Sequence, residues 1–180
     1  DAQVSGSVLV SPKAGEASLT LEDSELKGDL LVETSGSAVT LADTSVEGEV
    51  ALSGDKTVLT LEGSAKAARV AVDGAENTVT LGADASVDTL TARAAVKVDN
   101  QGTIDKAEIQ ASGVVLDGNK PGSIQVSEGV DAPTDSDGQE VVDGVENLSG
   151  VVGVRPVDQD SPETLLPEVT AKATKTDGED

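Results

Sequence analysis

The residues best able to do chemistry in this chain are its acids, and one short segment gathers several of them. Asp135 and Asp137 flank a serine within DSDG, and Glu140 follows the glycine. Closely spaced oxygen ligands and a glycine for a tight turn are what a calcium-binding loop requires. A complete loop would also need acids where Pro133 and Gly144 stand. Two interpretations stay open, a calcium site at these three acids and an ordinary solvated acidic loop, and the loop fits the pattern better.

The rest of the composition argues against catalysis. The chain has no His, Cys or Tyr, so the usual general bases and several nucleophiles are missing. Its 34 acidic residues single out no carboxylate pair of the kind a glycosidase uses. Arg69 and Arg93 lie one repeat apart, as a polysaccharide lyase could use them, but isolated arginines are more often surface charges. We therefore predict that the protein is not an enzyme and carries no cofactor, with calcium as the one candidate ligand.

A regular framework must position these side chains, and the sequence contains one. The segments SLTLEDS, AVTLADT, VLTLEGS and TVTLGAD recur at a spacing of twenty residues. They align three columns: Leu19, Val39, Leu59 and Val79; Thr20, Thr40, Thr60 and Thr80; and Leu21, Leu41, Leu61 and Leu81. Alternation within each segment indicates a strand with one inward face. A constant spacing between segments indicates that equivalent strands stack.

A second group of strands keeps the same phase. Its inward columns are Val8, Leu30, Val50 and Val70, then Val10, Val32, Leu52 and Val72, with a corner column of Val4, Leu26, Val46, Val87, Ile104 and Ile124. Later repeats shorten, and we expect Val79 to be followed in its column by Val96 and then by Val114. Gly, Ser, Asp and Asn fill the turns between strands.

These columns predict an all-β fold, a parallel β-solenoid of about six coils with roughly 20 residues in each coil. We expect the coil to be right-handed. An antiparallel sandwich is the alternative, but a sandwich does not require a fixed phase between segments. Helices are excluded, because the apolar residues have a period of two.

The domain boundaries follow from where the columns stop, near Val130. We predict a solenoid over residues 1–130 and an acidic linker over residues 131–140. Residues 141–180 are expected to form an irregular C-terminal extension, with a capping or docking segment and a flexible tail.

Two stretches, LKGDLLVETSGSAVTLADTSVEGEVALSG and KTVLTLEGSAKAARVAVDG, resemble the parallel β-helix repeats of bacterial cell-surface proteins that often neighbour S-layer-type anchoring domains. The resemblance covers residues 4–130. It implies an extracellular structural or display role, and it brings no catalytic residues with it. The absence of aromatic residues departs from the pattern and leaves open a designed repeat protein without a natural function.

Four apolar residues occupy positions that should face solvent, namely Leu9, Leu31, Ala51 and Ala71. A contiguous apolar stripe usually marks a contact. We predict an interface here, covered either by residues 141–170 of the same chain or by a neighbouring subunit. Open solenoid ends also present unpaired backbone groups, which favours head-to-tail stacking into a filament.

The net charge of −22 decides which partners to expect. Nucleic acids and anionic membrane surfaces would repel the chain, and no apolar run approaches the length of a membrane span. We expect self-association, an extracellular or cell-surface location, and a role as a surface or filament building block. The alternative is a glycan-binding or calcium-dependent adhesin.

Overall fold

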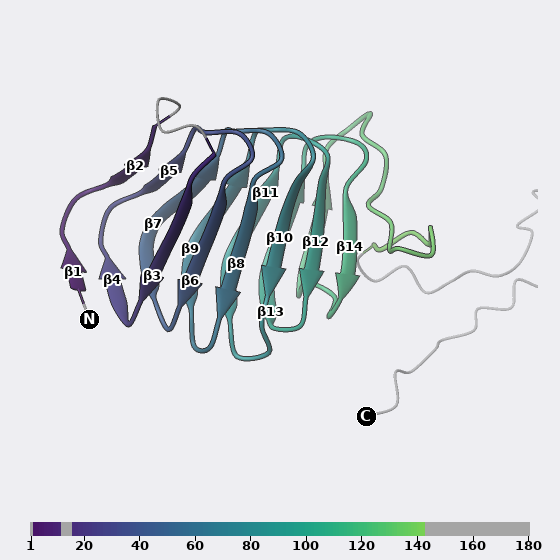
Figure 1. Ribbon diagram of the computed structural model, residues 1–180. Coiled ribbons are helices and arrows are strands. Elements are labelled where there is room, and N and C mark those ends of the chain that lie inside the picture. Colours follow the sequence, from purple (N-terminus) through teal and green to yellow (C-terminus); the bar gives the residue numbers. More distant parts are fainter. Residues whose placement is uncertain (1, 12–15, 143–180) are drawn as a thin grey trace, which may run out of the picture. The chain divides into compact units, whose positions relative to one another are not determined.

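The computed structural model describes residues 2–11 and 16–142, and within them every regular element is a β-strand. The strands form two sheets that face each other along the solenoid (Figure 1). The first sheet holds β1 (Ala2–Val4), β2 (Val8–Val10), β4 (Ser24–Leu26), β5 (Leu30–Val32), β7 (Ser45–Leu52), β9 (Lys66–Val72), β11 (Ser86–Ala92), β13 (Thr103–Ile109) and β15 (Ser123–Val126). The second holds β3 (Ser18–Glu22), β6 (Ala38–Ala42), β8 (Val58–Glu62), β10 (Asn77–Leu81), β12 (Val96–Asn100) and β14 (Val115–Gly118).

The named strands pair in parallel with the strands one coil before and after them. Leu21 lies beside Leu41, and Leu41 beside Leu61. The prediction of a parallel β-solenoid of about six coils is confirmed. In Figure 1 the front strands run downward, the back strands run upward, and successive coils advance away from the N-terminus, which makes the coil right-handed.

The space between the sheets holds a narrow core of aliphatic side chains. Its best-buried large members, each with 0% of its surface exposed, are Leu30, Leu41, Leu52, Leu59, Leu61, Leu81, Leu90 and Ile109. Burying one such side chain contributes roughly 1.5–3 kcal/mol. A core only one side chain deep from each sheet can be filled by Leu, Val, Ile and Ala, and this is why the chain folds without aromatic residues.

The shorter later coils correct the expected continuation of one column. Val79 lies beside Val98 rather than Val96, and Val98 lies beside Leu116 rather than Val114. Both Val96 and Val98 point inward and are buried. Alternation alone therefore could not decide which of them follows Val79, because the length of the preceding turn sets the register.

The corner column also differs from the expectation. Ala67 follows Val46 and fills a place that the sequence columns left empty. Ile124 lies beside Ala107 instead of following Ile104. A bulge in β7, where the pairing with β9 shifts before Glu49, places Ala67 one residue later than a constant spacing predicts. The last coil is shorter, and this brings Ile124 beside Ala107.

The turns repeat as faithfully as the strands do. Two corners adopt left-handed backbone in successive coils, one at Asp23 (φ 47°), Asp43 (47°) and Gly63 (58°), the other at Gly36 (70°), Lys56 (55°) and Glu76 (57°). Buried polar side chains fasten neighbouring turns. The Oδ1 atom of Asn77 accepts a hydrogen bond from the N–H of Thr57 at 2.7 Å, and its Nδ2 donates to the carbonyl of Gly74 at 3.1 Å.

Stacked turns leave no room for side chains at some glycines, which gives a stability test. A Cβ on Gly74 would lie inside van der Waals contact of the backbone carbonyl of Gly54 in the preceding coil. We expect Gly74→Ala to lower the free energy of unfolding by about 2 kcal/mol or more, because the two coils must separate locally. Gly6→Ala is the matched control, since nothing lies within 4 Å of its added Cβ. Urea denaturation measures both, and equal effects would contradict this account of the stacking.

Candidate functional site

The predicted apolar stripe exists as a column on the outer face of the first sheet. Leu9 pairs with Leu31, Leu31 with Ala51, and Ala51 with Ala71. Its exposure falls sharply along the column, from 55% at Leu9 to 8% at Ala51 and 1% at Ala71. Apolar surface is therefore concentrated at Leu9 and the half-buried Leu31, at the N-terminal end.

Ion pairs flank the buried alanines of this column. The Nε atom of Arg69 lies 3.8 Å from a carboxylate oxygen of Glu49, and the Nη1 atom of Arg93 lies 3.1 Å from one of Asp73. Such partly exposed pairs contribute little stability. Both arginines are thus paired with acids of this chain, which leaves them poorly placed to bind an anionic substrate.

The acidic segment forms a turn. One carboxylate oxygen of Asp135 accepts hydrogen bonds from the N–H groups of Asp137 at 3.0 Å and Gln139 at 2.8 Å. The N–H of Asp135 donates to the carbonyl of Gln139 at 2.8 Å. Glu140 is exposed and forms an antiparallel bridge with Thr134. Within residues 2–11 and 16–142, the structure gathers no group of three or more acids that could hold a metal ion.

The same turn belongs to a strap that closes the C-terminal end of the second sheet. Thr134 donates its N–H to the carbonyl of Val114 at 3.1 Å and accepts from the N–H of Leu116 at 2.8 Å. Val130 and Val141 pack against the core, and Pro133 is buried. Residues 131–140, expected to be a linker, therefore lie on the last coil, while residues 143–180 of the expected capping segment lie outside the described residues.

This strap could not be predicted from the sequence columns, because its pairing is short. Its bridges involve single residues rather than a strand, so no column could predict them. The available signal was the turn chemistry of DSDG between the apolar Val130 and the apolar Val141, which is typical of a chain that reverses and returns to a surface.

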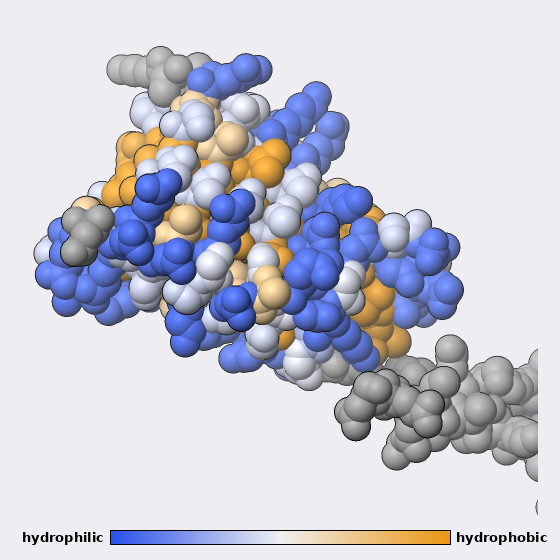
Figure 2. All heavy atoms as spheres, turned by 60° about the horizontal axis from the view of Figure 1, so that its bottom comes forward, coloured by the Kyte–Doolittle hydropathy of each residue, from blue (hydrophilic) through white to orange (hydrophobic). Residues whose placement is uncertain are grey.

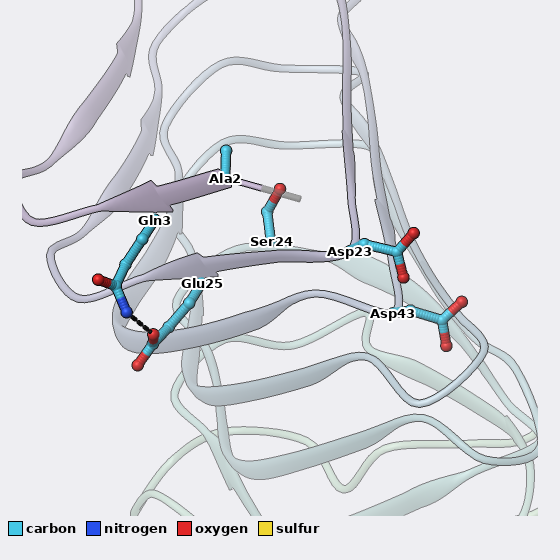
Figure 3. Close-up of a pocket in the computed structure, with 6 residues that line it drawn as sticks. All are labelled: Ala2, Gln3, Asp23, Ser24, Glu25 and Asp43. Atoms are coloured by element: carbon cyan, nitrogen blue, oxygen red, sulfur yellow. Dashed lines mark hydrogen bonds between the residues drawn. The ribbon is translucent and has the colours of Figure 1, made fainter.

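The N-terminal end contains a shallow hollow lined by Ala2, Gln3, Asp23, Ser24, Glu25 and Asp43 (Figure 3). Gln3 donates a hydrogen bond to Glu25 across two coils. In Figure 3, Asp23 and Asp43 lie one above the other at the corner, away from this pair. Asp43 accepts from the N–H of Ser64 at 2.9 Å and from its hydroxyl at 3.0 Å.

The electrostatics of this hollow do not suit acid–base chemistry. The hydrogen bond from Gln3, together with the nearby Lys27, lowers the pKa of Glu25. The hydrogen bonds from Ser64 lower the pKa of Asp43. Both carboxyls are ionised at neutral pH, and a general acid would instead need a raised pKa.

Hydrophilic residues cover much of the visible face of the solenoid, and apolar residues show between them and toward both ends (Figure 2). In the described part of the chain, no helix is long and apolar enough to cross a membrane. Comparisons with protein-family models, with curated proteins and with solved structures find no match to this chain. Its role must be argued from its own surfaces.

The strap offers a test that depends on pH. The hydroxyl of Ser136, then its N–H at 2.7 Å, and the ammonium of Lys97 at 3.6 Å lower the pKa of Asp117 in the folded state. A lowered pKa contributes stability above the pKa of the unfolded chain, and that contribution is lost as the pH falls through the folded pKa. We expect hydrogen exchange of the Thr134 amide, corrected for its intrinsic pH dependence, to rise on acidification.

The variant Asp117→Asn should show several-fold faster exchange at Thr134 at neutral pH and little further change in acid. Asp99→Asn, one coil earlier in the same column, is the control and should behave like the parent protein. Equal behaviour of the two variants would show that Asp117 does not hold the strap.

Proposed function

We propose that this chain is a non-enzymatic structural protein, an extracellular β-solenoid rod that serves as a self-associating building block of a surface layer or filament. The observation that carries the proposal is the continuous parallel pairing of the strands from coil to coil. One sheet continues from β1 to β15 and the other from β3 to β14, with backbone bonds linking each coil to the next.

A stack of this kind is suited to a stiff spacer. Each interior coil buries its aliphatic side chains between the coils on either side, and the connecting turns are short and hydrogen-bonded. A protease needs a locally unfolded segment, and opening one interior coil disrupts its contacts with both neighbours. Resistance to proteolysis is a useful property for a protein outside the cell.

The side chains that could do chemistry support a structural role as well. Among the described residues, the carboxyls with a shifted pKa share one direction, because each pKa is lowered. They are Glu25, Asp43, Glu108 and Asp117. Arg69 and Arg93 are engaged in ion pairs. A carboxyl with a lowered pKa is ionised at neutral pH, so none of these four is suited to act as a general acid there.

The charge supports an ordered mode of association. With a net charge of −22, rods repel each other side by side. Contacts are then favoured only where the surface is poor in charge.

Native proteolysis tests the rod. We expect thermolysin to leave a resistant fragment that retains β3 through Val141, because cleavage inside the stack requires a coil to open. Mass spectrometry identifies the ends of the fragment. Early cleavage at turns within β6 to β12 would contradict a stiff spacer, and Gly74→Ala, which loosens two coils, serves as the sensitised control.

Surface labelling tests the location. Antibodies raised against the folded chain should bind intact cells of its source without permeabilisation. A signal that appears only after the cells are permeabilised would rule out the extracellular part of the proposal and leave the rod itself intact.

A further inference from the structure

The strap, residues 130–142, begins as though it were the next strand of the second sheet. Thr134 pairs in parallel with Val115 of β14, through backbone bonds to Val114 and Leu116. It therefore occupies the place, and has the direction, of a strand that a further coil would add (Figure 1). Within the strap, this parallel pairing is limited to the single residue Thr134.

The two neighbours of Thr134 are unsuited to continue the solenoid. Pro133 falls beside the buried Val114, and the N–H that proline lacks would face away from β14, toward an added strand. Asp135 falls beside the buried Leu116, where the preceding coils place apolar residues. A carboxylate buried there under another coil would need a partner. That of Asp135 accepts the N–H groups of the following turn instead.

The chain then reverses and covers its own outer edge. Glu140 pairs with Thr134 in an antiparallel bridge, and the N–H of Val141 donates to the carbonyl of Pro133 at 2.8 Å. The strap is thus a short hairpin, with a first arm parallel to β14 and a second arm that runs the opposite way. A strand of a further coil would meet an arm of the wrong direction, so the parallel stack cannot continue across it.

Contacts outside the hairpin hold the strap against the last coil. Near its start, the N–H of Asp131 donates to the hydroxyl of Ser112 at 3.0 Å. Near its end, the ammonium of Lys120 donates to the carbonyl of Val142. Two valines of the strap also pack against the core. Because it is fastened on both sides of the turn, the hairpin stays in place as a cover of β14.

Charge adds to the effect of the reversed arm. Residues 131–140 contain four acids and no base, so they carry −4. Asp137 and Glu140 among them are exposed. Charged residues and a covering loop are both means by which sheet edges avoid pairing with another chain. Another copy of this chain, with its net charge of −22, is repelled from the strap as well.

We propose that the strap is a stop, a hairpin that ends the second sheet and keeps the edge of β14 from pairing with another molecule. Every coil contributes strands to both sheets, so closing one sheet prevents a further coil from adding in register. The stop argues against the head-to-tail stacking that an open end would favour. It goes beyond the proposed function, because it holds whether or not rods associate through other surfaces.

Replacing residues 131–141 of the full-length chain with a Gly/Ser linker of equal length tests the stop. The linker leaves the carbonyl of Val114 and the N–H of Leu116 open to another molecule. We expect sedimentation equilibrium to give an association constant at least ~10-fold above that of the parent chain, because these backbone bonds then form between molecules. A folded linker variant that associates no more than the parent would overturn the proposal.

A matched pair of lysines locates the contact in the linker variant. Val115 and Val58 belong to the same outward column, on the last strand of the second sheet and on an interior one. Val115→Lys should return association to the parent level, because a lysine on an edge strand opposes pairing. Val58→Lys adds the same charge and should leave the raised association unchanged. Equal effects of the two lysines would place the contact elsewhere and contradict the stop.

Circular dichroism verifies the fold, since each variant must keep a β-sheet spectrum and melt cooperatively. If the linker variant unfolds, Thr134→Pro in the parent chain is the milder test, because it removes the N–H that donates to Val114. It should raise association several-fold, and parent-like behaviour of the folded variant would overturn the proposal. Association of the parent chain bears on the proposed function, whereas only the change on opening the strap bears on the stop, so either can fail alone.

Discussion

The structure depends on one constraint. Each coil must close so that its backbone can hydrogen-bond in parallel with the backbone of the coil before it. Parallel bonds along the solenoid fix every residue to a partner roughly one coil away, so the chain has to place similar side chains at similar phases. This requirement explains the columns of Leu and Val inside, and the repeated left-handed corners. It also explains why Lys56 and Glu76 adopt positive φ, although neither residue favours that backbone region. The stacking of the coils outweighs the local preference.

The strands could be predicted because two independent periods agree, alternation within a strand and phase between strands. Where one period failed, so did the prediction. Val96 and Val98 satisfy alternation equally, and only the length of the turn makes Val98 the partner of Val79. The corner column lost its phase at the bulge before Glu49. Bulges and turn lengths depend on three-dimensional closure of the coil, which a pattern of apolar residues does not contain.

The sequence could predict where the candidate surfaces lie in the fold, but it could not predict how much of each side chain is exposed to solvent. Leu9, Leu31, Ala51 and Ala71 do form a column, yet exposure depends on neighbours that the sequence places elsewhere in the chain. Ala71 is only 1% exposed, and residues 69 and 73 on either side of it form ion pairs with residues of adjacent coils. The acidic segment shows the same limit. Its spacing suits a solvated turn better than a metal loop but does not exclude either. In the structure the carboxylate of Asp135 accepts hydrogen bonds from the backbone N–H groups of the turn.

A repeat also determines where distinct functions can arise. Interior coils are nearly interchangeable, since each presents the same backbone edges to its two neighbours. Differences must therefore come from positions where the repeat is broken, and the described chain breaks it unequally at its two ends. The first coil carries the exposed Leu9, whereas the last coil carries a strap anchored by Asp117 and Thr134. The asymmetry between the ends, rather than the regularity between them, is what gives the rod a direction.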